Sequence, residues 1–499
     1  MAANTHLTLL VIIVAYFLLL LALALVTGRR ADNDAFFIGN RKSNWLLVAF
    51  GMVGTSLSGV TFISVPGTVG GNGFGYLQVV IGNWIGFMAI AAILLPLYYR
   101  LQLTSIYDYL DQRFGVAAHK TGALFFILSR TLGATARLYL VVNVLHILVG
   151  APAGIPFWLT TLVILLMIWL YTFQGGDKTI VFTDTLQTAC MLGGLLICIL
   201  FLMDALGLNT TTLAASIDNT TYTKVWNTDV NAPGFWLKQV LGGAFIAIAM
   251  TGLDQEMMQK NISVPNLRDS QKNMALFSLV LVIVNLLFLL LGALLYLFAT
   301  ANQITATGDQ IFPTVVMQHF PQWVQIIFFI ALISALFPSA DGALTALTSC
   351  FCNDILGFKK QLDSTEASRT RIRHITHITF AVVFFAIVMI FKWMDDRSII
   401  DTILKLAGYT YGPLLGLFAF GMLTKRALPN GSALVCATLA APVMCYLIQW
   451  ALSQNPSGFQ IGIELLILNG TLTFGLLWLI STQSVENLTD QNRSFPSGL

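Results

Sequence analysis

Thirteen apolar segments, most of them about 20 residues long, constrain the fold of this 499-residue chain more than any other feature. A helix needs about 20 apolar residues to cross the hydrocarbon core of a bilayer. Only 10% of the residues are charged, against about 25% in soluble domains. The pattern therefore predicts an all-α membrane protein with about 13 transmembrane helices. The segments cover residues 6–27, 44–66, 75–99, 121–150, 157–173, 181–205, 234–253, 274–299, 322–352, 372–393, 400–422, 431–452 and 460–481.

The basic residues predict how the chain is oriented. With the N-terminus outside the cell, 19 of the 26 Lys and Arg residues lie on the cytoplasmic side, as the positive-inside rule requires. This predicts a multi-pass protein of the plasma (cell inner) membrane with a cytoplasmic C-terminus. The first segment is expected to remain as a helix, because it lacks the basic start and cleavage site of a signal peptide. Most basic residues cluster in the loops between apolar segments, which gives no sign of nucleic-acid binding.

A single membrane domain with three parts and a tail accounts for the whole chain. We expect an N-terminal flanking helix in residues 1–30, a core in 44–423, C-terminal flanking helices in 431–481 and a polar cytoplasmic tail in 482–499. The longest loops are predicted at 206–233 outside the membrane and at 254–273 and 353–371 inside. The six cysteines all lie in apolar segments without ligand-like spacing, so they predict neither disulfides nor a metal site.

One apolar segment, FGMVGTSLSGVTFISVP (50–66), is interrupted by three glycines and several hydroxyl residues. A helix that spans the bilayer must satisfy its own backbone hydrogen bonds. Such a weak point therefore predicts a broken helix beside an enclosed, hydrated cavity. Close packing of small residues against another helix is the alternative. A similar pattern, AIAMTGLDQEMMQ (247–259), recurs five segments later. An odd number of helices between equivalent breaks predicts two inverted five-helix repeats, with broken first and sixth core helices.

Several stretches resemble motifs of the sodium:solute symporter family. They are ADNDAFFIGNRKSNWLLVAFGMVGTSLSGVTFISVPG (31–67), LTSIYDYLDQRFG (103–115), YTFQGGDKTIVFTDTLQ (171–187), DQEMMQKN (254–261) and GPLLGLFAFGMLTKRALPNGS (412–432). The resemblance covers nearly the whole chain. It implies the leucine-transporter-type fold and alternating access driven by sodium.

The resemblance also implies a main Na⁺ site between the first and eighth core helices. Its ligands would be the carbonyls of Gly54, Leu57 and Ala335, with the adjacent pair Pro338 and Ser339 on the eighth core helix. The family usually has two hydroxyl residues at that pair, and Pro338 has none. A serine that bonds back to its own helix is the alternative for Ser339.

Two acidic residues in apolar segments, Asp184 and Asp341, predict a second site for sodium or a proton. A carboxylate inside the membrane is costly unless it meets an ion, water or a partner, and the resemblance implies a second cation at the Thr183–Asp184 position. The alternative for Asp184 is a salt bridge to Lys178.

The solute is predicted to bind near the first break. Arg130 and Arg137 lie seven residues apart on one face of the fourth segment, where a guanidinium must be paired. One of them would hold a carboxylate of the solute; pairing with Asp184, Asp341 or backbone carbonyls is the alternative. Further solute contacts are predicted from the hydroxyl residues and from the helix that follows the break: Ser56, Ser58, Thr61, Tyr76, Gln78 and Asn83.

These observations predict a secondary active transporter that couples inward sodium flux to uptake of a small organic solute, with an organic anion such as a sugar acid or monocarboxylate favoured. The alternatives are a symporter of a neutral sugar or amino acid, and a transporter-like sensor. An enzyme is not expected, because the sequence contains no HExxH or GxSxG motif and its six histidines are scattered. The sequence leaves the oligomeric state and the identity of the solute open.

Overall fold

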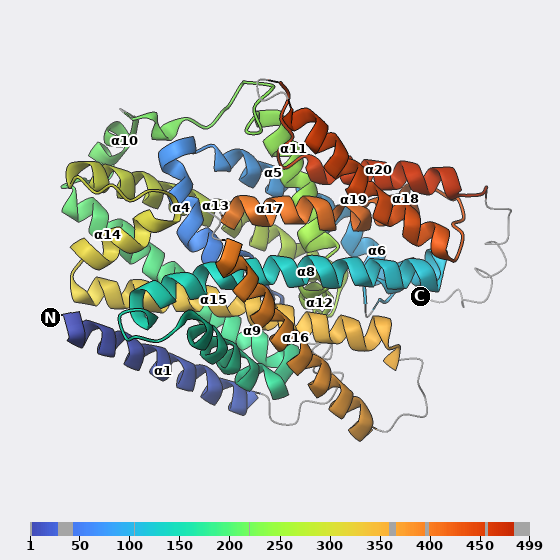
Figure 1. The fold of residues 1–499 in the computed structure, drawn as a ribbon, viewed down its shortest axis with the longest axis horizontal. Coiled ribbons are helices and arrows are strands. Elements are labelled where there is room, and N and C mark those ends of the chain that lie inside the picture. The colour runs from blue at the N-terminus through green and yellow to red at the C-terminus, as the bar shows by residue number, and fades with distance from the viewer. Residues whose placement is uncertain are drawn as a thin grey trace.

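The protein is built from helices in every part of the chain that the structure, a computed structural model, describes. These parts are residues 2–27, 43–103, 105–218, 220–358, 366–394, 399–454 and 458–483. Side chains at 2–7, 9–10, 173–179, 181, 210, 366 and 399–402 also lie outside the description. Within these limits the only β pairing is an isolated bridge between Ala427 and Thr482. In Figure 1 the long helices α8, α13 and α15 run roughly alongside one another.

The first part of the chain contains α1 (Ala2–Thr27), α3 (Trp45–Ser56), α4 (Gly59–Asn72), α5 (Tyr76–Ala89), η2 (Ile90–Leu94), α6 (Leu95–Arg100), α7 (Asp108–Phe114), α8 (Val116–Leu145), η3 (His146–Gly150), α9 (Phe157–Ala205), α10 (Thr210–Asp218) and η4 (Thr221–Thr223). The second part contains α11 (Trp236–Ala247), η5 (Ile248–Gly252), α12 (Gln255–Ile262), α13 (Leu267–Ala301), η6 (Gly308–Gln310), α14 (Ile311–His319), α15 (Gln322–Cys350), η7 (Phe351–Ile355), α16 (Glu366–Met394), α17 (Ile399–Thr410), α18 (Gly412–Leu423), α19 (Ser432–Ser453) and α20 (Leu465–Ile480).

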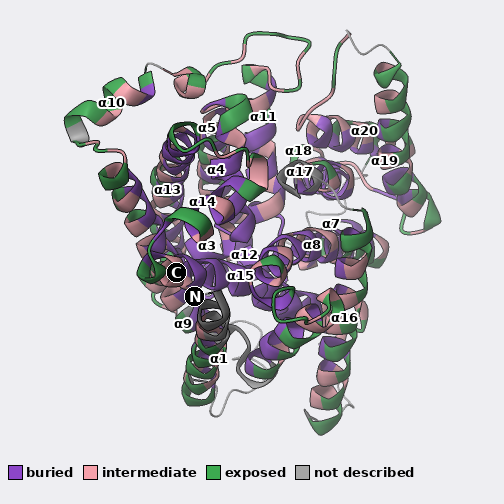
Figure 2. Ribbon diagram, turned by 60° about the vertical axis from the view of Figure 1, so that its left-hand side comes forward, coloured by how far each residue is buried: buried purple, intermediate pink, exposed green. Residues whose placement is uncertain are grey.

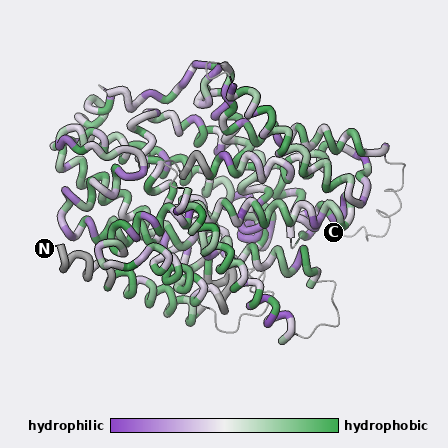
Figure 3. The backbone as a smooth tube through the Cα atoms, viewed as in Figure 1, coloured by the Kyte–Doolittle hydropathy of each residue, from purple (hydrophilic) through white to green (hydrophobic). Residues whose placement is uncertain are grey.

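The helices are long and apolar enough for a multi-pass membrane protein. Seven described helices qualify as single spans, and three bent pairs of helices qualify when each pair is taken as one span. Three shorter apolar helices cover Val11–Val26, Phe157–Thr172 and Leu465–Ile480. Figure 3 shows hydrophobic residues along most helices. The prediction of an all-α membrane protein is confirmed.

Both predicted broken helices are present. The chain bends by 57° between α3 and α4, and by 66° between α11–η5 and α12. A third bend of 43° separates α17 from α18 at Tyr411. The first bend falls where Gly54, Ser56 and Ser58 weaken the helix, because glycine has a low helix propensity and serine competes for backbone hydrogen bonds.

The centre of the molecule is formed by α15, which is buried along most of its length (Figure 2). It packs against α9 and α8 and also contacts both halves of the first bent pair, α3 and α4. Elsewhere α5 packs on α11, and α13 packs on α4. The first break therefore lies against a helix that is buried along most of its length.

One predicted boundary is wrong, and two predicted segments share one helix. Residues 157–173 and 181–205 match the apolar stretches Phe157–Thr172 and Phe182–Ala205, and both lie in α9, whose backbone is helical between them. The predicted inner loop at 254–273 does not begin at 254, because residues 254–264 are buried and form α12 and the turn after it. Their polarity is compensated by distant charged partners rather than by water.

Candidate functional site

The first break leaves backbone carbonyls without partners. The Leu57 N–H still donates to the Val53 carbonyl at 2.8 Å, and Ser58 then adopts an extended conformation before α4 begins. Among the described residues, no hydrogen bond reaches the carbonyl of Gly54 or that of Leu57. Both residues are buried. Buried carbonyl oxygens freed in this way are suitable ligands for a hard cation.

The facing part of α15 contains the other predicted sodium ligands. Ala335, Pro338 and Ser339 are all buried. The Ser339 hydroxyl donates to the Leu336 carbonyl at 3.0 Å, so in this conformation it bonds back to its own helix. Pro338 lacks an N–H, so it leaves the carbonyl of Ser334 without its usual helical partner. Helix α15 contacts α3 and α4, so these residues belong to the helix that packs against the first break.

The second break is closed by side chains instead. The Tyr98 hydroxyl donates to the Gly252 carbonyl at 2.7 Å, and the Tyr107 hydroxyl donates to the Leu253 carbonyl at 3.0 Å. Asp254 caps α12 by accepting hydrogen bonds from the N–H groups of Glu256 and Met257 at 3.0 and 3.2 Å. This break therefore offers no free carbonyl at Gly252 or Leu253.

A buried chain of charges connects α9, α12 and α8. The Lys260 ammonium lies 2.8 Å from Asp184 Oδ2, donates to the Thr55 hydroxyl at 2.6 Å and lies 3.7 Å from Glu256. Glu256 in turn forms an ion pair with Arg130. These acidic and basic side chains are at most 4% exposed, so the charges compensate one another rather than meeting water.

Arg130 lies between two acidic side chains in this conformation. It pairs with Glu256 and lies 3.7 Å from Asp254, which also accepts a hydrogen bond from the Tyr411 hydroxyl at 2.9 Å. This matches the alternative of structural pairing, but the acidic partners differ from the expected Asp184 and Asp341. The network ties α8 to the second break and to the bend at Tyr411.

Arg137, by contrast, has no carboxylate in direct contact within the described chain. No hydrogen bond or ion pair among the described residues reaches its guanidinium, although Arg130, Tyr411, Glu256 and Asp254 are close enough to act on it electrostatically. Its side chain is half-buried, and Tyr76 is an electrostatic neighbour. A half-buried guanidinium without an anion is suited to receive one.

Asp341 has neutral partners. Its carboxylate accepts hydrogen bonds from the Tyr171 hydroxyl and from the Gly342 N–H, each at 2.5 Å. Asp184 is near enough for the two acids to interact electrostatically. One oxygen of Asp184, Oδ1, has no hydrogen-bond partner among the described residues. The side chain of Lys178, the alternative partner of Asp184, lies outside the described residues.

The remaining predicted solute contacts lie on both sides of the first break. Ser56 and Thr61 are half-buried and Ser58 is buried. On α5, Gln78 is buried and donates to the Gly75 carbonyl at 3.0 Å, while its carbonyl oxygen has no partner within the described chain. The buried Asn83 carbonyl oxygen is likewise without a partner there.

A cavity of about 940 Å³ lies beside the half of α8 that follows Arg137. Tyr139, Leu140 and Asn143 line it on one side, and Thr307 to Gln310 together with part of α14 line it on the other. Its size is within the range of small-molecule sites.

Sequence reasoning missed Lys260, Glu256, Asp254 and their tyrosine partners. One local signal was present, since Glu256 and Lys260 are four residues apart, the spacing of a helical ion pair. The polarity of the stretch suggested a loop instead. The partners on α8 and α9 are 126 and 76 residues away in the sequence, and spacing does not reveal them.

Comparisons with known proteins agree with this architecture. A sequence model described as "Sodium:solute symporter family" matches residues 36–438. The sodium/sialic acid symporter SiaT of Proteus mirabilis is 25% identical over 422 residues, covering 82% of each chain. The sodium/sialic acid symporter NanT of Aliivibrio fischeri is 24% identical over 480 residues, covering 92% of this chain and 91% of the relative. A solved structure of a Na⁺-coupled sialic acid symporter in a substrate-bound, outward-open state superimposes with a TM-score of 0.80 at 18% identity, covering 95% of this chain and 99% of that one. At that identity the structural likeness shows the fold alone.

Proposed function

This chain belongs to the sodium:solute symporter family and is a sodium-coupled symporter, and we propose that its solute is an organic anion such as a sugar acid or a monocarboxylate. The observation that carries this proposal is the contrast between the two arginines of α8. Arg130 is paired with Glu256, whereas Arg137 has no acidic partner among the described residues. The relatives SiaT and NanT are named for sialic acid, a carboxylated sugar.

The proposed solute site places the carboxylate on Arg137. A guanidinium can bind a carboxylate through two charge-assisted hydrogen bonds. Ser56, Ser58 and Thr61 at the break would meet the hydroxyl groups of a polar solute, with Tyr76 and Gln78 from α5. The proximity of Tyr76 to Arg137 supports this grouping.

The proposed main sodium site uses the carbonyls of Gly54, Leu57 and Ala335 with the hydroxyl of Ser339. The free Gly54 and Leu57 carbonyls support it. Pro338 supplies no side-chain oxygen, so Ser339 is the only hydroxyl ligand of the pair. The Ser339 hydroxyl would turn from the Leu336 carbonyl to the ion, a rotation about one side-chain bond.

We propose that Asp184 and Asp341 form a second cation site, and that the Lys260 ammonium competes with the cation for Asp184. In the conformation described here the Lys260 ammonium already supplies a positive charge to Asp184 Oδ2. A second sodium ion or a proton would bind only when Lys260 moves away. The unpartnered Oδ1 of Asp184 is the atom from which such binding would start.

We further propose thirteen spans with two inverted five-helix repeats in residues 44–423, flanked by helices in 1–30 and 431–481, and with the N-terminus outside the cell. The two breaks, five predicted segments apart, support the repeats. In the proposed cycle the solute crosses the plasma membrane chemically unchanged.

Uptake by the purified full-length protein in proteoliposomes tests this function. Labelled sialic acid, lactate, glucose and leucine would be compared with and without an inward sodium gradient. We expect sodium-driven uptake of an acid and its loss in Arg137→Lys, while Arg113→Lys, which changes an arginine bonded to the carbonyls of Thr424 and Arg426, behaves as the wild type does. Preferred uptake of glucose or leucine would overturn the anion proposal. Solute recovered in altered form would show an enzymatic activity.

A further inference from the structure

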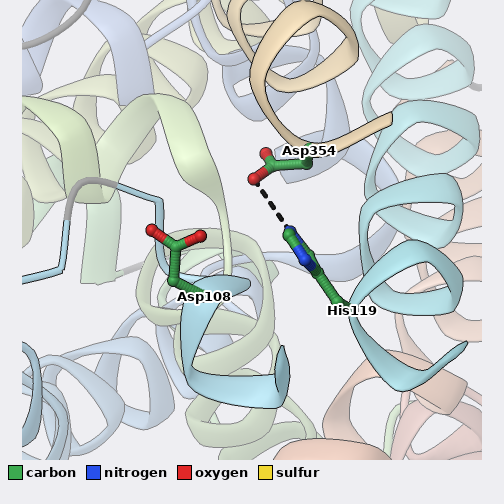
Figure 4. A group of neighbouring side chains, drawn as sticks. All are labelled: Asp108, His119 and Asp354. Atoms are coloured by element: carbon green, nitrogen blue, oxygen red, sulfur yellow. Dashed lines mark hydrogen bonds and ion pairs between the residues drawn. The ribbon is translucent and has the colours of Figure 1, made fainter. Parts of the chain in front are cut away.

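A histidine and two carboxylates meet at one end of α8, separate from the sodium and solute residues. Asp108 begins α7, His119 lies in the first turns of α8, and Asp354 lies in η7, which continues α15. One potential ligand atom of each residue lies within 4.8 Å of the others. Figure 4 shows the three side chains converging from these three elements.

The histidine is held between acids. His119 Nε2 lies 3.0 Å from Asp354 Oδ1, and Nδ1 lies 3.8 Å from Asp111 Oδ2. His119 and Asp354 are buried. Ser105 fixes both carboxylates of the cluster, because its hydroxyl donates to Asp354 Oδ2 at 3.0 Å and its N–H donates to Asp108 Oδ2 at 3.2 Å.

We propose that this cluster binds a divalent transition-metal ion of the Zn²⁺ type. His119 Nε2 and one carboxylate oxygen each from Asp108 and Asp354 would be the protein ligands, and water would complete a tetrahedron. A zinc ion with bonds of about 2.0–2.1 Å holds neighbouring ligand atoms about 3.3 Å apart. The His119 and Asp354 atoms are already at 3.0 Å, and a small movement of Asp108 would complete the set.

Two features favour an ion over a simple pair of His119 and Asp354. A hydrogen bond between them needs only one carboxylate, yet the Asp108 carboxylate also lies within 4.8 Å of both ligand atoms, where a shared cation would offset the repulsion between the two acids. In addition, Asp111 lies on the far side of the imidazole, where a metal-binding histidine typically directs its other N–H to a carboxylate. The imidazole ligand favours zinc or another transition metal over magnesium, which takes oxygen ligands.

A bound ion would connect parts that alternating access has to move. The segment before α7 is attached to the second break: the Ile106 N–H donates to Gln255 Oε1 at 3.0 Å, and the Tyr107 hydroxyl donates to the Leu253 carbonyl at 3.0 Å. The ion would therefore join the bent pair α11 and α12 to α8 and α15. Transport in this fold relies on movement of one helix group against another, so the ion would hold this end in one conformation.

Equilibrium dialysis of the purified full-length protein against ⁶⁵Zn²⁺, after treatment with a chelator, tests the site. We expect one ion per chain, and His119→Gln and Asp108→Asn should each raise the Kd on the order of 100-fold. Asn at 108 can still accept the Ser105 hydrogen bond, so this variant should fold. His146→Gln, at the other end of the same helix, should bind as the wild type does. Absence of saturable binding below about 100 μM, or wild-type affinity in both ligand variants, would overturn the site.

Amide hydrogen exchange tests the connection between helices. Saturating Zn²⁺ should slow exchange in residues 105–114 of the wild type and leave it unchanged in His119→Gln. Binding without this protection would overturn the proposed connection between the helices and leave the ion site itself in place.

Discussion

The buried pair of Asp184 and Lys260 should be strongly coupled in folding. Asp184 Oδ2 and Lys260 Nζ are 2.8 Å apart, and the two side chains are 0% and 2% exposed. Removing one partner of a buried pair leaves an uncompensated charge and costs about 3–5 kcal/mol. We expect Asp184→Asn and Lys260→Met each to lower the free energy of unfolding by about that amount. The double variant should lose at least about 2 kcal/mol less than the sum of the single losses.

An exposed pair with the same N–O distance provides a control. Lys272 Nζ lies 2.8 Å from Asp269 Oδ1, but the side chains are 50% and 29% exposed. Because water screens this pair, the corresponding cycle of Asp269→Asn and Lys272→Met should give far less coupling than the buried cycle. The two pairs have the same N–O distance and differ strongly in burial, so a large difference in coupling would indicate the effect of desolvation.

Denaturant unfolding in detergent micelles gives the four free energies of each cycle, and sodium titration of uptake is measured on the same variants. Additive losses in the buried cycle would refute the coupling. If Asp184→Asn keeps wild-type stability and lowers the number of sodium ions carried per solute, Asp184 acts mainly as a ligand of a coupling ion.

Further substitutions test the proposed sodium site, the proposed solute site and the packing beside Glu256. Ser339→Ala should raise the sodium concentration for half-maximal uptake severalfold, because one of about five oxygen ligands is lost. Pro338→Ser should lower that concentration, and an unchanged sodium curve in Ser339→Ala would exclude Ser339 as a ligand. Arg137→Lys should raise the KM for an acidic solute about 10–100-fold, equivalent to about 1.4–2.8 kcal/mol, with sodium activation retained; normal uptake would assign Arg137 to the scaffold. Gly342→Ala should destabilise the protein by about 1–3 kcal/mol, because the new Cβ would lie 2.2 Å from Glu256 Oε1; a wild-type melting temperature would contradict this.

Residues that act through their own backbone could be predicted from the sequence. The helix is weak around Gly54 and Ser58 because of the residues there. The break could therefore be predicted from local composition and from the rule that a membrane helix must satisfy its own backbone hydrogen bonds. The bend before Asp254 was predicted in the same way. Both are present, at 57° and 66°.

Residues that act through distant partners could not be predicted. Arg130 and Arg137 lie seven residues apart on one apolar helix, and the sequence does not distinguish their surroundings. Only the fold shows that Glu256 lies beside Arg130. Lys260 resembled a loop lysine because its compensating acid is 76 residues away. Polarity predicts exposure only when the charges involved lack partners, and that depends on tertiary packing.

The Lys260–Asp184 pair also has a bioenergetic consequence. While the ammonium remains on Asp184, uptake of a monovalent anion with one sodium ion moves no net charge, and the membrane potential contributes nothing to accumulation. If the lysine yields to a second sodium ion, each cycle carries one positive charge inward. That charge adds about 2.3 kcal/mol per 100 mV, or roughly a 50-fold higher limit on the concentration ratio. The position of one buried side chain would thereby decide whether the cell concentrates this solute with its sodium gradient alone or with its membrane voltage as well.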